Sequence, residues 1–299
     1  MAQFEVNAAL DGRPLGAVVK ALFEMTWSKA RDAIASGKVQ LDGAQALDER
    51  LTCKLGSVIV LSMNAPRKDK HKEDAPKIVY VDEDVVVVDK PAGVITTPFD
   101  NEHDTLIDQV RQMLYRKGSG QRPELGLVHR IDKETSGLIV FTRGFDAKRE
   151  LGAQFKGHST ERRYLAIVHG KVEAQMFSSR LVEDRGDGLR GSTLSARDGL
   201  KAVTHVTPVR ELRGATLIVC RLETGRTHQI RIHLSEAGHP LVGERVYIRD
   251  YEGTRIAAPR LMLHAAELGF VHPVSKKTVH WKLPLPPDME QLIQQRLTV

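Results

Sequence analysis

Residues 126–138 read GLVHRIDKETSGL, and this segment decides the fold because it places a charged loop directly before an apolar run typical of a buried strand. Asp132 lies in that loop with Arg130 and Lys133 on either side, and nearby positive charge favours the ionised form of a carboxyl group. A charged carboxylate in a loop can act as a nucleophile. A surface loop held by ion pairs is the alternative that the residue types alone leave open.

A second segment rich in cations and histidines is residues 222–233, LETGRTHQIRIH. Its pattern predicts a helix over residues 227–237 with Thr227 as the N-cap and with His228, Arg231 and Ser235 on one face. Such a face suits a phosphate or a carboxylate. His228 and His233 lack the i,i+4 spacing of a helical zinc site and have no evident third ligand, so we expect no metal.

Upstream of these segments the chain begins with a small helical unit. The apolar spacing predicts helices over residues 15–23 and 28–36, the second ended by Gly37 in a left-handed conformation. Asp42-Gly43 is a hairpin turn signal between strand-like runs, and the unit ends near Met63. Residues 64–77, NAPRKDKHKEDAPK, have little to bury and predict a charged linker. The expected domains are therefore residues 1–63 and 78–299.

The second domain has the pattern of a mixed α+β fold. A helix is expected between Asp104 as its N-cap and Gly118 at its end, and another over residues 146–155. Strand-like composition covers residues 78–81, 85–88, 138–142, 164–168, 216–222 and 263–270. A length of 299 residues fits two domains of this kind.

Composition and charge narrow the class of partner. Lys and Arg number 44 against 38 Asp and Glu, a formal net charge of +6, which favours a polyanionic partner. Cys53 and Cys220 lie far apart without a CxxC or Cys/His pattern, so two free thiols are expected. The sequence shows neither a secretory signal nor a membrane-spanning run, and we expect a soluble cytoplasmic protein.

The motifs HRID-KETSGL and LETGRTHQIRIHLSEAGHPLVGE together resemble the RluA-type pseudouridine synthases. The resemblance extends over residues 78–287, through KPAG at residues 90–93, RYLAIVHG at 163–170 and LHA at 263–265. Residues 26–43, TWSKARDAIASGKVQLDG, resemble the S4 RNA-binding module. The combination implies a small αα-β S4-like domain followed by a catalytic domain built on a mixed, mainly antiparallel sheet with flanking helices.

The resemblance also implies a reaction and a set of site residues. Uridine becomes pseudouridine when the N1–C1′ bond breaks, the uracil turns and C5 joins C1′, and no cofactor is needed. Asp132 corresponds to the catalytic aspartate, Arg231 to the basic residue that pairs with it, and Tyr164 to the tyrosine that stacks on the flipped uracil. RNA contacts are expected from Arg130, which would fill the space left by the base, and from His129, Arg226, His228, Lys29, Arg31 and Lys38. The implied partner is large-subunit, 23S-type ribosomal RNA, bound by a monomer.

Two other functions stay open. A non-catalytic S4-type RNA-binding protein would have the same appendage, although Asp132, Tyr164 and Arg231 are all present. A glycoside hydrolase would use Asp132 and Glu134, because residues two apart in an extended segment lie about 6.6 Å from each other, within the range of such carboxylate pairs. Transfer RNA is the alternative substrate to ribosomal RNA.

Overall fold

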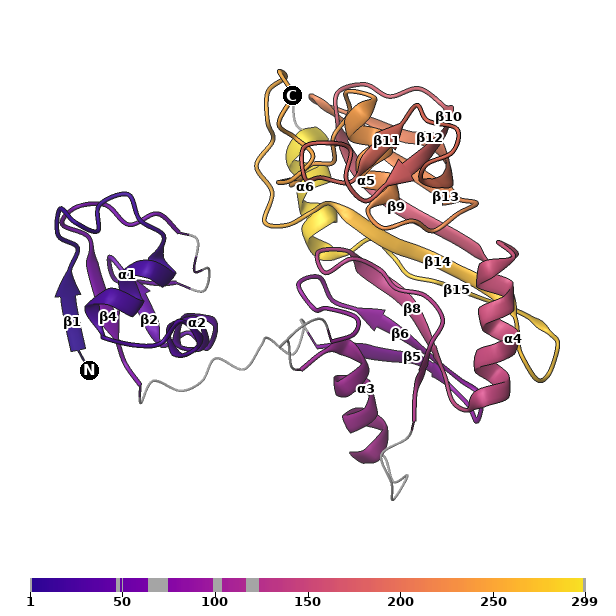
Figure 1. Ribbon diagram of the computed structural model, residues 1–299, viewed down its shortest axis with the longest axis horizontal. Helices are drawn as coiled ribbons and strands as arrows, with labels where there is room; N and C mark the ends of the chain where they lie inside the picture. Colours follow the sequence, from indigo (N-terminus) through magenta and orange to yellow (C-terminus); the bar gives the residue numbers. More distant parts are fainter. Residues whose placement is uncertain are drawn as a thin grey trace. The chain divides into compact units, whose positions relative to one another are not determined.

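The structure is a computed structural model that describes residues 2–46, 49, 51–63, 75–98, 104–116 and 124–297 (Figure 1). The chain divides into two compact units, Met1–Ala75 and Pro76–Val299. Most of the linker predicted at residues 64–77 lies outside the described residues, as does the helix end predicted at Gly118.

The first unit contains two helices and a small sheet. Helices α1 (Leu15–Leu22) and α2 (Trp27–Ala35) pack through apolar faces onto a sheet of strand order β1-β4-β2-β3. Its strands are β1 (Ala2–Glu5), β2 (Val39–Leu41), β3 (Ala44–Gln45) and β4 (Val58–Leu61). The predicted turn is confirmed, since Asp42 and Gly43 both have positive φ, at 52° and 78°. Gly37, at φ 72°, has the expected left-handed conformation.

The second unit is built on one long sheet, of order β11-β10-β12-β13-β9-β14-β8-β6-β5, with β15 added to β14 and β7 to β8. Strands β8 and β14 are parallel, whereas every other described pair is antiparallel. The predicted α+β class with a mixed, mainly antiparallel sheet is therefore confirmed. The strands are β5 (Lys77–Val81), β6 (Val85–Lys90), β7 (Gly126–Leu127), β8 (Ser136–Thr142), β9 (Glu161–His169), β10 (Gln175–Val182), β11 (Gly191–Thr193), β12 (Leu200–Leu212), β13 (Ala215–Leu222), β14 (Leu263–Val271) and β15 (Thr278–Lys282).

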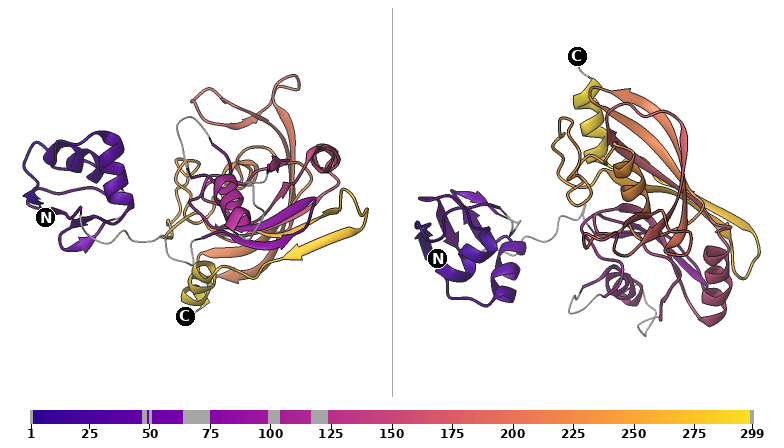
Figure 2. Two further views of the ribbon diagram at one scale, coloured as in Figure 1. Left: turned by 90° about the horizontal axis from the view of Figure 1, so that it is seen from below. Right: turned by 45° about the horizontal axis from the view of Figure 1, so that its top comes forward.

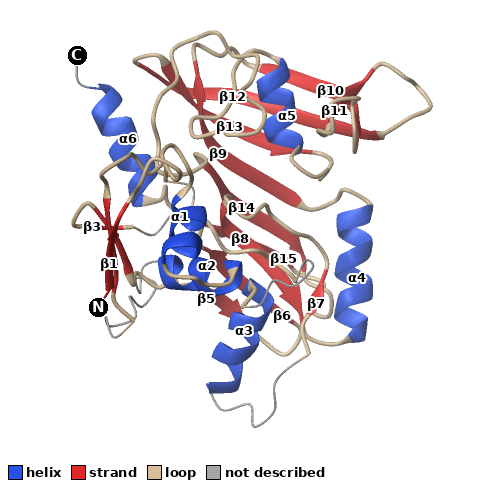
Figure 3. Ribbon diagram, turned by 60° about the vertical axis from the view of Figure 1, so that its left-hand side comes forward, coloured by secondary structure: helices blue, strands red, loops and turns tan. Residues whose placement is uncertain are grey.

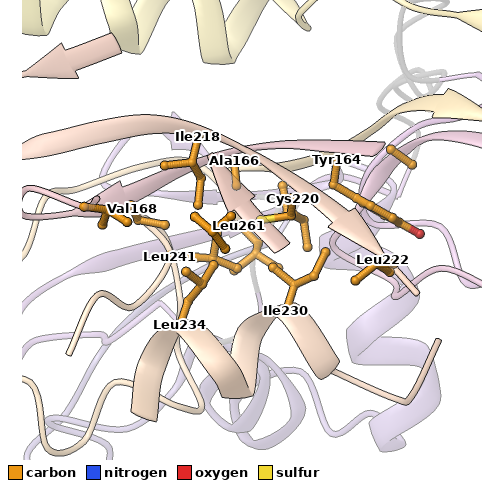
Figure 4. Close-up of a cluster of buried hydrophobic side chains, with 14 of the residues drawn as sticks. Tyr164, Ala166, Val168, Ile218, Cys220, Leu222, Ile230, Leu234, Leu241 and Leu261 are labelled. Atoms are coloured by element: carbon orange, nitrogen blue, oxygen red, sulfur yellow. The ribbon is translucent and has the colours of Figure 1, made fainter. Parts of the chain in front are cut away.

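Within the described residues of the second unit, four helices pack on this sheet, which Figure 2 shows from two further sides. They are α3 (Leu106–Leu114), α4 (Phe145–Lys156), α5 (Gln229–Glu236) and α6 (Pro287–Leu297). Figure 3 shows α5 over the half of the sheet that contains β12 and β13. There Ile230 and Leu234 pack against Ile218 and Cys220 (Figure 4). This packing fixes α5, and with it Arg231, relative to the strands.

Two helix starts differ from the sequence prediction. The N-cap of α3 is Thr105 rather than Asp104, which precedes it with φ 63°. The Thr105 hydroxyl donates to the Asp108 side chain at 2.6 Å, which joins the N-cap residue to the first turn of the helix. The N-cap of α5 is His228, also left-handed at φ 58°, and not Thr227. His228 therefore stands before the helix and does not share a helical face with Arg231 and Ser235.

Both cysteines are buried free thiols. Cys220 lies in the core beneath α5, and burial raises the pKa of its thiol to about 12. Among the described residues, no helix is both long enough and apolar enough to span a membrane.

Candidate active site

A cavity of about 610 Å³ opens beside the loop that contains Asp132. It is bounded by that loop, the end of α4, the start of β9, the end of β13 and the start of α5. Its lining includes Arg130, Asp132, Phe155, Lys156, His158, Arg162, Tyr164, Leu222, Gly225, Arg226, Thr227, His228 and Arg231. The Asp132 side chain is 23% exposed, so a ligand in the cavity can reach its carboxylate.

Lys90, a fully buried lysine at the end of β6, holds the Asp132 loop through hydrogen bonds. Its ammonium donates to the carbonyls of Pro91, Val94 and Lys133 at 2.8 to 3.0 Å. Burial lowers the pKa of Lys90 to about 7. On the other side of the loop, the Thr96 hydroxyl donates to the Ile131 carbonyl at 2.9 Å. The residues on both sides of Asp132 are thus held by hydrogen bonds.

The second residue of the strand after the loop is a glycine that no other residue can replace without strain. Gly137 has φ 112° and pairs with Ala265 where β8 and β14 run parallel. A Cβ atom at Gly137 would lie 2.3 Å from the Ala265 carbonyl oxygen. The close approach of the two strands, which positions the loop above them, therefore requires glycine.

Arg231 lies between two carboxylates, those of Asp132 and Glu244. The family resemblance predicts the first of these neighbours but not the second. Its Nη1 is 3.7 Å from the Asp132 Oδ2 atom. Its Nε and Nη2 donate to Glu244 at 2.8 and 2.7 Å. Burial alone would lower the pKa of Arg231, but its hydrogen bonds and ion pair with Glu244 outweigh burial and raise the pKa. The guanidinium stays charged and faces Asp132.

His228 and Arg130 complete the surroundings of Asp132. The His228 Nε2 atom is 4.0 Å from Asp132 Oδ2, and its Nδ1 shares a 2.7 Å hydrogen bond with the Tyr247 hydroxyl. Burial lowers the pKa of His228, which favours the neutral ring at pH 7. Arg130 is exposed and donates to the Thr227 hydroxyl at 2.9 Å. The predicted N-cap Thr227 instead accepts a hydrogen bond from the loop across the cavity.

Tyr164 forms part of the cavity wall and belongs to the core beneath α5. Only 8% of it is exposed, and it packs with Ile131, Leu222 and Leu263. Figure 4 shows the ring at the end of this cluster, with its hydroxyl directed away from the aliphatic side chains. Burial raises the pKa of Tyr164 to about 12, so the phenol is protonated at neutral pH.

His129, for which we predicted an RNA contact, is used in packing. Its ring stacks on Phe155 at 4.3 Å between centroids, and its Nε2 accepts from the Val140 amide at 3.0 Å. Burial lowers its pKa to about 3, which keeps the ring neutral. Through these contacts His129 supports the loop. It also lines the cavity, and an RNA contact by His129 stays a prediction.

The remaining predicted RNA contacts fall in two places. Arg226 lines the cavity in the turn before α5, where its Nε donates to the Lys201 carbonyl. Lys29 and Arg31 are exposed on α2 of the first unit, and Lys38 follows that helix, directly before β2. The Arg31 Nε atom lies 3.7 Å from the Glu49 Oε2 atom. These three residues belong to the first unit, whereas the residues that line the cavity belong to the second.

The charges of the lining favour an anionic ligand that approaches one carboxylate. In the part of the chain that the structure describes, five Lys or Arg residues line the cavity, and Asp132 is the one Asp or Glu that does so. Glu134 is exposed and lies outside the lining, so the pair of carboxylates that a glycoside hydrolase requires is not assembled here.

Two residues that build the site, Glu244 and Gln229, are not among the site residues that the sequence predicts. Glu244 is fully buried and, besides Arg231, accepts backbone N–H bonds from residues 245–247. Gln229 is buried and bonds the turn at Thr224 and Arg226 as well as strand β12. Glu244 follows Arg231 by 13 residues, so their ion pair can be predicted only when the path of the loop between them is known. The sequence hints at the burial of Glu244 only by placing this charged residue directly after the apolar residues LVG at 241–243.

Comparison with known proteins finds relatives over nearly the whole chain. The family model described as RNA pseudouridylate synthase matches residues 84–236. A Zymomonas mobilis protein named ribosomal large subunit pseudouridine synthase D is 36% identical over 292 residues, which cover 93% of this chain and 92% of that one. A Pseudomonas aeruginosa protein of the same name is 32% identical, with coverage of 97% and 93%. The solved structure of human RNA pseudouridylate synthase domain containing 4 has the same fold, with a TM-score of 0.60 at 23% identity over 74% of this chain and 92% of that chain.

Proposed function

The chain belongs to the RNA pseudouridylate synthase family, and from this premise we propose that it isomerises specific uridines of large-subunit ribosomal RNA to pseudouridine. The names of its relatives support the ribosomal substrate. The observation that carries the proposal is the charged pair of Asp132 and Arg231, 3.7 Å apart in a cavity that a nucleotide can enter.

In this proposal Asp132 acts on the ribose. It attacks C1′ as a nucleophile or accepts the proton of C2′, and either step needs an ionised carboxylate close to the sugar. Arg231 supports that role because an adjacent guanidinium stabilises the anion and orients it. The N1–C1′ bond breaks, the uracil leaves with the electron pair of that bond, turns in the cavity and forms the C5–C1′ bond. In that step Asp132 leaves C1′ or returns the proton to C2′, and the base loses a proton at C5 and gains one at N1. Atoms balance without an external reagent, so no cofactor takes part.

Tyr164 is proposed to stack on the uracil during this turn. Its ring forms an apolar wall of the cavity, and its protonated hydroxyl can donate a hydrogen bond to the base or exchange a proton as C5 loses its hydrogen. Arg130 is proposed to fill the gap that the flipped base leaves in the RNA stack. Its exposed guanidinium, held at the rim by Thr227, has the planar shape and charge for that position.

We propose that the first unit is an S4-like module that binds RNA through Lys29, Arg31 and Lys38. These cations lie on or directly after α2, and the exposure of Lys29 and Arg31 suits phosphate contacts. The protein is proposed to act as a monomer in the cytoplasm, where ribosomal RNA is available. The domain boundaries proposed are residues 1–63 and 78–299, joined by a charged linker.

A pseudouridine map of total cellular RNA from cells with and without this protein tests the proposal. We expect one or a few pseudouridines of large-subunit ribosomal RNA to disappear without the protein and to return when purified protein is added to that RNA. Loss of sites in transfer RNA alone would contradict the assigned substrate, and an unchanged map would contradict the activity.

A further inference from the structure

Arg162, at the start of β9, is a buried cation in the cavity wall to which the reaction described above assigns no role. Only 6% of it is exposed. Its Nη2 donates to the Glu223 carbonyl at 3.2 Å, whereas its Nε is buried without a hydrogen-bond partner. Among the described residues no carboxylate forms an ion pair with it. Arg231 differs in this respect, because Glu244 neutralises it.

The guanidinium of Arg162 is held in place by the atoms around it. The Phe155 ring lies beneath it, with 5.7 Å between the Arg162 Cζ atom and the ring centroid. A Cβ atom at Gly225 would lie 2.6 Å from Arg162 Nη1, so the glycine makes room for the guanidinium. A planar group fixed between a ring and a backbone is already oriented for a ligand and loses little entropy on binding one.

More positive charge gathers around Arg162. Three more residues that can be positively charged line the same cavity. They are Lys156 at the end of α4, His158 in the loop that follows, and Arg226 in the turn after β13. Burial and the charge of Arg226 lower the pKa of Arg162. A buried charge that lacks a counter-ion destabilises the free protein, and an anion that enters the cavity would supply the missing charge.

We propose that Arg162 anchors a binding site for one phosphodiester of the RNA, adjacent to the nucleotide whose base enters the cavity. The inference rests on the proposed function, because that function makes RNA the ligand. Phosphate oxygens suit the fork of an arginine, and an anionic ligand compensates the buried charge better than a neutral uracil carbonyl does. A phosphodiester bound by Arg162 would fix the RNA backbone in the cavity, so that Asp132 meets the ribose.

The test uses a short RNA that contains the uridine identified by the cellular map. Each phosphodiester near that uridine is replaced, one at a time, by a neutral methylphosphonate. With the wild-type protein we expect one replacement to lower kcat/KM about tenfold or more, as the loss of a hydrogen bond to a charged group does. With Arg162→Met we expect that kcat/KM is already reduced and that the same replacement changes it less than twofold. The substrate change leaves the protein intact, so folding does not affect the wild-type result.

Arg163→Met is the matched control. Arg163 is the next residue of β9, on the other face of the strand, and it pairs with Glu161 and Glu267 outside the cavity. We expect this variant to respond to every methylphosphonate as the wild type does. The slope of log kcat/KM against log salt should also become shallower by about 0.7 in Arg162→Met, the value for one lost phosphate contact on a single strand.

Two results would overturn the site. In one, every methylphosphonate lowers kcat/KM equally in the wild type and in Arg162→Met. In the other, Arg162→Met keeps wild-type kinetics and salt dependence. In both cases the wild type still makes pseudouridine, which separates failure of this inference from failure of the proposed function, in which the wild type makes none.

Discussion

Glu244 holds Arg231 through two charge-assisted hydrogen bonds of 2.8 and 2.7 Å, both shorter than the 3.7 Å between Arg231 and Asp132. Glu244 is itself fixed, because its side chain is fully buried and accepts backbone N–H groups of the loop that follows. The guanidinium is therefore clamped on one edge and presents its remaining nitrogen, Nη1, to Asp132. Glu244 is a positioning residue that acts through Arg231.

Glu244→Gln tests this clamp. The amide keeps the shape but removes the negative charge, and breaking a buried ion pair costs about 3–5 kcal/mol, part of which the remaining hydrogen bonds offset. We expect a lower free energy of unfolding and a kcat reduced about tenfold or more, with KM changed much less, as measured by denaturant unfolding and steady-state pseudouridine formation.

Glu267→Gln is the control for that experiment, because Glu267 pairs with Lys282 and Arg163 and does not line the cavity. It should leave kcat near the wild-type value. Glu244→Asp keeps the charge and should recover part of the activity. If Glu244→Gln lost stability but retained full kcat at a temperature where it is folded, Glu244 would have no positioning role.

Gly137→Ala is expected to destabilise the protein more than Gly144→Ala. Both glycines have φ 112°, so both substitutions introduce backbone strain of about 1–3 kcal/mol. Only at Gly137 does the new Cβ meet the Ala265 backbone, whereas no atom lies within 4 Å at Gly144. The clash should add about 1–3 kcal/mol in denaturant unfolding. Equal losses in the two variants would show that β8 and β14 do not need their close approach.

The stability of the protein should fall as the pH falls below about 6.5, in part because of His129. Its pKa is lowered to about 3, so between pH 6.5 and 3 the unfolded chain binds a proton that the native protein does not. Each pH unit in this window then removes about 1.4 kcal/mol per such histidine. His129→Gln retains an acceptor for the Val140 amide and should make the dependence of unfolding free energy on pH shallower.

The same substitution at His280, whose side chain is 41% exposed, provides the comparison. A His129→Gln protein with the wild-type slope would mean that His129 titrates normally in the native state.

How far the sequence predicts this protein depends on whether a contact is local. The Asp42-Gly43 turn and the strand at residues 138–142 follow from short patterns, and the structure contains both. Strand β10 lacks such a pattern, because most of its residues are at least partly exposed and polar residues interrupt the apolar ones. The start of α5 was misplaced because the side chain of Gln229 bonds the Arg226 amide and shapes the preceding turn.

The site shows the same division. The approach of Arg231 to Asp132 was expected from the family resemblance, and the two residues are close. Glu244 and Arg162 were not predicted, because their importance depends on burial. That Glu244 is buried, and that Arg162 has a buried nitrogen without a hydrogen-bond partner, can be recognised only once the surroundings of both residues are known.

The most direct measurement of the central claim compares Asp132→Asn with the wild type on large-subunit ribosomal RNA lacking the modification. Asparagine preserves the size of the side chain but removes the anion, so we expect RNA affinity to stay within a few-fold while pseudouridine formation, measured by mass spectrometry of nuclease digests, disappears. Pseudouridine formation by Asp132→Asn at a rate near that of the wild type would contradict the account.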